Sequence, residues 1–82
     1  MVRQAEPRVR TLDLSGEVCP YTFLRSKLAL EEMDPGDELI ILLDHRPAFD
    51  SVPRALRLEG HEVLGVDRSG DRCTVHARKG GP

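Results

Sequence analysis

Residues 34–43 decide the fold, and they read Asp34-Pro35-Gly36-Asp37-Glu38-Leu39-Ile40-Ile41-Leu42-Leu43. Proline and glycine in the first half of this stretch stop a helix and turn the chain. The five apolar residues that follow have the length of a β-strand and are bounded by a turn, which is typical of a buried strand. The stretch therefore predicts a turn at 34–37 and a central strand at 39–43.

The residues before this turn predict a strand followed by a helix. Residues 20–33 contain no glycine and no further proline, and they are rich in Leu, Ala, Lys, Arg and Glu, which favour helix. Pro20 fits the first helical position, where its missing N–H is not needed. Upstream, Thr11 to Leu14 alternates as a short strand does, and residues 15–17 form a turn. Cys19 is thereby predicted at or beside the N-cap of the helix.

The residues after the central strand predict a second helix from Ala48 to Glu59, ended by a glycine at position 60. Pro53 conflicts with this helix because it removes a backbone hydrogen bond unless it lies in the first turn. We therefore expect the regular helix to start near Ser51, with Asp50 or Ser51 as its cap.

Two further strands complete the predicted domain, Glu62–Val66 and Arg72–Arg78, joined by a hairpin loop at 68–71. In the last strand alternate residues are expected to face the core, namely Cys73, Val75 and Ala77. The predicted order is β-α-β-α-β-β. This order indicates an α/β protein of the α+β two-layer sandwich type, with two helices on one face of a four-stranded mixed sheet.

Length and charge limit the classes of function. Eighty-two residues suffice for one domain, expected at 10–79, with a flexible lead-in at 1–9 and a frayed tail at 80–82. Twelve basic residues against fourteen acidic ones give a net charge of −2, which does not favour direct binding of nucleic acid. No apolar stretch is long enough to span a membrane, and the charged start lacks the apolar region of a signal peptide. We expect a cytoplasmic protein, and its size and polarity favour a monomer.

Two cysteines are present, Cys19 and Cys73, and they lie far apart in the chain and in different predicted elements. Their spacing predicts neither a zinc site nor a CxxC redox pair. Cys19 is the candidate reactive thiol, because a helix N-terminus favours the thiolate that attacks or carries sulfur. The alternative is that Cys19 is a small buried apolar residue. Cys73 is predicted to be structural, and His45 and His61 are expected to be ordinary surface residues.

The first helix has two apolar stripes, although a helix on one sheet face buries only one of them well. One stripe contains Phe23, Leu30 and Met33, and the other contains Tyr21, Leu24 and Leu28. The second stripe is either an exposed docking surface beside Cys19 or part of a more enclosed core. Arg25 and Lys27, further along the helix, are candidates to add positive potential near the cysteine.

Three segments resemble the TusA/SirA-like family of sulfur-carrier proteins. They are Leu12-Asp13-Leu14-Ser15-Gly16 with Val18-Cys19-Pro20, then Asp34-Pro35-Gly36-Asp37-Glu38-Leu39, and then Val52-Pro53 through Gly60-His61-Glu62-Val63. The resemblance implies the fold described above and a persulfide on Cys19. The donor would be a cysteine desulfurase or a rhodanese-type protein, and the recipient a sulfur-acceptor protein. It implies a carrier rather than a stand-alone multiple-turnover enzyme, with no cofactor and no metal.

One residue departs from the family pattern, which is typically Cys-Pro-x-Pro. Thr22 stands at the second proline, where it restores a backbone N–H and brings a hydroxyl that caps the helix or hydrogen-bonds a sulfur anion. The sequence thus assigns the sulfur chemistry to Cys19, Pro20 and Thr22, and partner binding to Tyr21, Leu24, Arg25 and Leu28. Among relatives the routes served are tRNA thiolation, cofactor sulfuration and sulfur oxidation. The rival hypothesis is a non-catalytic regulatory or protein-interaction module on the same fold.

Overall fold

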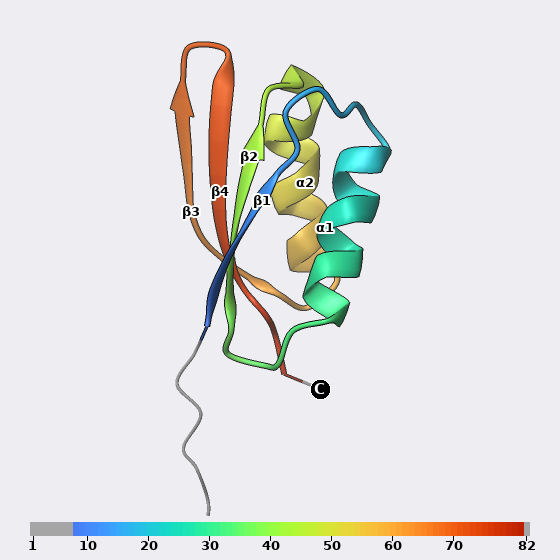
Figure 1. Ribbon diagram of the computed structural model, residues 1–82, viewed down its shortest axis with the longest axis vertical. Coiled ribbons are helices and arrows are strands. Elements are labelled where there is room, and N and C mark those ends of the chain that lie inside the picture. Colours follow the sequence, from blue (N-terminus) through green and yellow to red (C-terminus); the bar gives the residue numbers. More distant parts are fainter. Residues whose placement is uncertain (1–7, 82) are drawn as a thin grey trace, which may run out of the picture.

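The computed structural model describes residues 8–81 and contains six elements in the predicted order. They are β1 (Val9–Asp13), α1 (Tyr21–Glu31), β2 (Glu38–Leu43), α2 (Arg46–Leu58), β3 (Glu62–Ser69) and β4 (Arg72–Arg78). Both helices lie on the same side of the sheet (Figure 1). The predicted α+β sandwich is therefore confirmed.

The four strands form one mixed sheet in the order β1-β2-β4-β3. β1 is parallel to β2, which α1 makes possible as the crossover, and β4 is antiparallel to both of its neighbours. Ile41 of β2 is paired with Leu12 on one side and with Val75 on the other. The apolar run at 39–43 is thus an interior strand, as its composition predicts.

The core lies between the sheet and the helices. Every second residue of β2 and β4 is buried, and these residues are Leu39, Ile41, Leu43, Cys73, Val75 and Ala77. Leu30 of α1, and Val52 and Leu56 of α2, are fully buried against them. Full burial of one such side chain stabilises the fold by roughly 1.5–3 kcal/mol. The opposite sheet face carries half-buried and charged residues, so the hydrophobic layer is on the helix side only.

The second helix starts earlier than predicted. Its N-cap is His45, and Pro47 occupies the first turn, while Pro53 lies inside the helix. The expectation of a start near Ser51, with Asp50 or Ser51 as cap, is wrong. Five residues of α2 are buried, Ala48, Phe49, Val52, Pro53 and Leu56. Packing of this face outweighs the hydrogen bond lost at Pro53.

The other element ends differ from the prediction by a few residues. α1 begins at Tyr21 with Pro20 as its N-cap, and it ends at Glu31 rather than at Met33. β3 continues to Ser69, which pairs with Arg72, so the hairpin loop shrinks to a two-residue turn. Within the described residues no helix is long and apolar enough to cross a membrane.

Both predicted tails lie partly outside the described residues, which exclude 1–7 and 82. Val9, assigned to the lead-in, is the first residue of β1. Gly80, assigned to the tail, is held in place because its N–H donates to Nδ1 of His61 at 3.0 Å. A Cβ at Gly80 would collide with the carbonyl oxygen of Gly60, so this position requires glycine.

Candidate functional site

Cys19 lies in the loop between β1 and α1, directly before the N-cap Pro20, and it is exposed. The Cys19–Pro20 peptide bond is cis. The loop is tied to the end of β2, because the N–H of Gly16 donates to both carboxylate oxygens of Asp44 at 2.9 and 3.1 Å. A second bond, from the Glu17 N–H to the Leu14 carbonyl at 3.0 Å, closes the turn. The cysteine is therefore presented by an anchored loop.

The first turn of α1 leaves one backbone donor free. The amides of Tyr21 and Thr22 both donate to the Val18 carbonyl, at 2.8 and 3.3 Å, and the Leu24 amide donates to Pro20. Proline carries no side-chain acceptor, and no side chain caps this helix. Among the residues that the structure describes, none accepts a hydrogen bond from the Phe23 N–H. The helix end beside Cys19 thus keeps a donor and the partial positive charge of the helix dipole.

Two hydroxyl groups flank the sulfur. Oγ1 of Thr22 lies 3.6 Å from Cys19 Sγ, and Oγ of Ser51 lies 3.7 Å from the same atom. A hydroxyl donates to a sulfur anion and accepts from a thiol, so both groups suit either protonation state of the cysteine. Thr22 comes from α1 and Ser51 from α2, which places the sulfur between the two helices.

Thr22 does not cap the helix, because the N-cap is Pro20 and its side chain makes no capping bond. The threonine is fully buried, and its carbonyl accepts a 2.8 Å bond from Oγ of Ser26, also fully buried. Of the two roles predicted for the Thr22 hydroxyl, capping is wrong. The contact with the cysteine sulfur is the one present.

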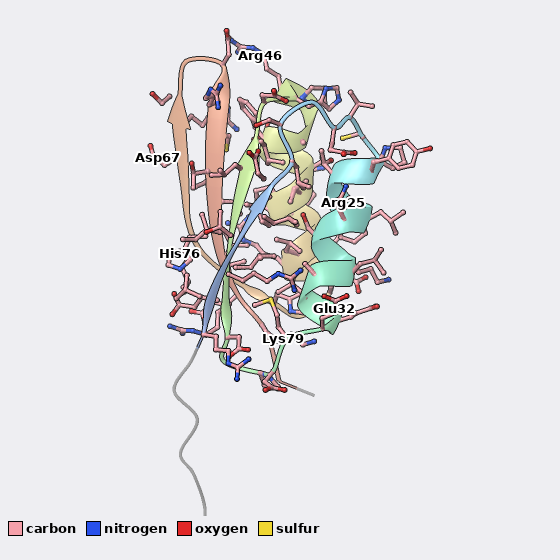
Figure 2. The ribbon with its side chains drawn as sticks, in the orientation of Figure 1. Arg25, Glu32, Arg46, Asp67, His76 and Lys79 are labelled. Carbon is pink, nitrogen blue, oxygen red and sulfur yellow. The ribbon has the colours of Figure 1, made fainter. Side chains whose placement is uncertain are left out.

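The basic residues predicted to enrich the site in positive charge are paired with acidic residues. Arg25 forms an ion pair with Glu17 at 3.2 Å, and Lys27 forms one with Glu59 at 3.7 Å. Lys79, labelled in Figure 2, contacts the carbonyl of Leu30 and so lies at the far end of α1. Among the described residues, the side-chain groups that contact the cysteine sulfur are the hydroxyls of Thr22 and Ser51.

Neither candidate histidine makes a hydrogen bond to the cysteine. His45 is the N-cap residue of α2, and His61 accepts the Gly80 N–H beyond the other end of that helix. Burial, with the nearby charge of Lys79, lowers the pKa of His61. Both histidines are half-buried, and the expectation that they take no part in the sulfur chemistry stays a prediction.

The two stripes of α1 have different surroundings. Leu30 and Met33 are buried, whereas Tyr21, Leu24 and Leu28 are 56%, 46% and 49% exposed. Of the two hypotheses for the second stripe, enclosure in the core is wrong. An apolar surface therefore extends from the first residue of α1, two positions after Cys19, along the helix.

Cys73 is buried, whereas Cys19 is exposed. Cys73 is only 1% exposed, and its side chain belongs to the core. Burial raises the pKa of the Cys73 thiol, which disfavours the thiolate. The prediction of a structural role agrees with this environment. In residues 8–81 no three His, Cys, Asp or Glu side chains gather as metal ligands would.

Ser51 is the site residue that the sequence did not reveal. It was assigned to a helix cap, and it lies 32 positions from Cys19 in the chain. Its contact with the sulfur depends on how α2 packs beside α1, which no local pattern reports.

Comparisons with known proteins give a consistent result. Residues 10–79 match the family model described as Sulfurtransferase TusA. A protein of Archaeoglobus fulgidus named "Putative sulfur carrier protein" is 49% identical over 76 residues, which cover 88% of this chain and 86% of that protein. The protein TsuB of Escherichia coli, with the same designation, is 36% identical over 77% of this chain and 84% of its own. The crystal structure of a SirA-like protein from Desulfitobacterium hafniense matches with a TM-score of 0.74 at 23% identity, covering 88% of this chain and 99% of that one.

Proposed function

The chain belongs to the TusA sulfurtransferase family, and on that premise we propose that it is a sulfur carrier that holds sulfane sulfur as a persulfide on Cys19. One observation carries the assignment to this residue. Cys19 is exposed at the start of α1, whereas Cys73 is enclosed in the core. Only Cys19 is open to a second protein.

The proposed exchange balances without an external oxidant or reductant. The Cys19 thiolate attacks the outer sulfur of a donor persulfide, a new S–S bond forms at Cys19 Sγ, and the S–S bond of the donor breaks. The donor cysteine leaves as a thiolate. An acceptor thiolate then attacks the outer sulfur on Cys19. The S–S bond at Cys19 breaks, and Cys19 leaves as a thiolate. Two thiolates exchange one sulfur, so the step uses no general base of the carrier.

The surroundings of Cys19 suit the anion in both steps. The free Phe23 amide lies at the positive end of the α1 dipole, and the Thr22 and Ser51 hydroxyls lie within 3.7 Å of Sγ. These groups are neutral, so they stabilise an anion without forming an ion pair that a partner would have to break.

A sulfur carrier must dock on a donor and an acceptor protein, and we assign this role to the exposed stripe of Tyr21, Leu24 and Leu28. Apolar side chains beside a reactive group form the kind of surface that a partner buries. Arg25 lies on the same helix, where its ion pair with Glu17 supplies charges at the edge of the stripe.

The donor proposed is a cysteine desulfurase or a rhodanese-type protein. The acceptor is a protein of sulfur trafficking, in tRNA thiolation, cofactor sulfuration or sulfur oxidation. We place the exchange in the cytoplasm, because a reducing compartment keeps an exposed cysteine such as Cys19 as a free thiol.

The test is to incubate the protein with a persulfidated rhodanese and to measure its intact mass. We expect one added sulfur in the wild type and in Cys73→Ala, and none in Cys19→Ala. The assignment is wrong if the wild type gains no sulfur. It is also wrong if Cys73→Ala, rather than Cys19→Ala, abolishes the gain.

A further inference from the structure

Ser51 brings a hydroxyl of α2 to a cysteine that lies just before α1. Its Oγ lies 3.7 Å from Cys19 Sγ, close to the 3.6 Å that separates Thr22 Oγ1 from the same atom. Thr22 lies three positions after the cysteine in the chain, so its proximity follows from the local path of the chain at the helix start. Ser51 reaches the sulfur only because two helices pack together.

The position of Ser51 is fixed by its neighbours. Phe49 and Val52 are 3% and 0% exposed and anchor this turn of α2 in the core, while Ser51 itself is on the exposed side. The Lys27–Glu59 ion pair at 3.7 Å further links the two helices. The hydroxyl is therefore held beside the sulfur by packing in which it does not itself take part.

We propose that Ser51 is a positioning residue for sulfur transfer, whose hydroxyl donates a hydrogen bond to Sγ of Cys19 when this atom is a thiolate, before it attacks the donor and as it leaves the acceptor. This inference rests on the proposed carrier function. With Thr22 on one helix and Ser51 on the other, the sulfur is held from two sides while it stays open to solvent.

Neutral hydroxyls suit this role better than charged groups would. A cation at 3.7 Å from Sγ would hold the Cys19 thiolate tightly and would oppose its attack on a donor, and a carboxylate there would repel it. The basic residues of α1 are instead paired with Glu17 and Glu59. A single hydrogen bond favours the anion by a small factor, which allows both loading and release.

The experiment compares Ser51→Ala and Ser51→Thr with the wild type and with Ser69→Ala. Ser69 is an exposed serine at the tip of the β3–β4 hairpin, so its substitution is a matched control. The rate of alkylation of Cys19 by iodoacetamide is measured by mass between pH 5 and 10, with Cys19→Ala correcting for any reaction at Cys73. Persulfide loading from the rhodanese donor is measured on the same variants.

We expect the alkylation profile of Ser51→Ala to move to higher pH, with the rate at pH 7 lowered about threefold. Ser51→Thr keeps the hydroxyl and should restore the profile, and Ser69→Ala should match the wild type. An unchanged profile in Ser51→Ala overturns the proposal, as does an equal shift in Ser69→Ala or a failure of Ser51→Thr to restore it. A wild type that takes up no sulfur overturns the carrier function instead, because alkylation is measured without loading.

Discussion

Leu24 and Leu30 lie on the same helix and differ sharply in burial, so truncating each of them separates docking from folding. Leu24 is 46% exposed and Leu30 is fully buried. Removing a fully buried leucine costs about 2–5 kcal/mol, because contacts are lost and a cavity is left. Burying a leucine side chain completely stabilises a fold by roughly 1.5–3 kcal/mol, and Leu24 is only about half buried. Leu24→Ala should therefore lower the free energy of unfolding by about 1 kcal/mol or less.

The first assay is equilibrium unfolding in urea. A domain of this length has a free energy of unfolding of roughly 4–12 kcal/mol, so Leu30→Ala should remove a large part of it and Leu24→Ala a small part. Leu58 provides a matched control, because it is 81% exposed and is the last residue of α2, on the other helix. Leu58→Ala should leave stability nearly unchanged.

The second assay is the rate of sulfur transfer from a persulfidated rhodanese in a single turnover. We expect Leu24→Ala to slow transfer about fivefold or more, as truncation of a central contact in an interface does, and Leu58→Ala to leave the rate unchanged. Alkylation of Cys19 by a small reagent should be the same in both variants. If Leu24→Ala transfers sulfur at the wild-type rate, the stripe is not a docking surface. If it unfolds as readily as Leu30→Ala, the stripe belongs to the core.

Three further outcomes are expected. Thr22→Pro should change the free energy of unfolding by about 1 kcal/mol or less, because the backbone bond it removes, to Val18, is 3.3 Å long and proline is tolerated in a first helical turn. A large loss of stability in urea would contradict this. Gly80→Ala should destabilise the fold by about 1–3 kcal/mol, because the new methyl group meets Gly60; an unchanged urea midpoint would refute the contact. Burial lowers the pKa of His61, so the folded state favours the neutral ring. The resulting stability is fully present above the pKa of the unfolded chain, and it should be lost as pH falls through the lower pKa of the folded state. His61→Asn should flatten this dependence between pH 7.5 and 5, and an equally steep profile in the variant would count against it.

The local patterns of the sequence were sufficient for the element order and the central strand. The Asp34-Pro35-Gly36-Asp37 turn contains Gly36 at φ 95, a left-handed conformation that favours glycine, and an unbroken apolar run follows it. Both features act over a few residues, so they can be recognised without tertiary information. The start of α2 was predicted too late because the low helix propensity of Pro53 is a local signal. The burial of Phe49, Val52 and Pro53, which stabilises the longer helix, is a property of the assembled core.

The candidate site divides in the same way. Cys19, Pro20 and Thr22 are neighbours in the chain, so their grouping at a helix start follows from one helix prediction. The choice between docking surface and core for Leu24 needed the direction in which α1 packs, since both stripes are equally apolar in the sequence. Arg25 could be named from the sequence, but its pairing with Glu17 depends on the path of the loop before Pro20.

The two cysteines show how the same side chain acquires opposite properties within one small domain. Cys73 faces the helices from β4, and burial raises the pKa of its thiol, so its sulfur stays protonated and enclosed. Cys19 lies where a helix begins, with a free amide nearby and two neutral hydroxyls near its sulfur. A carrier must hold an anion well enough to load and loosely enough to release it. In the part of the chain that the structure describes, the side chains in contact with the Cys19 sulfur are two neutral hydroxyls, one from each helix, and this arrangement is the basis of the proposed carrier role.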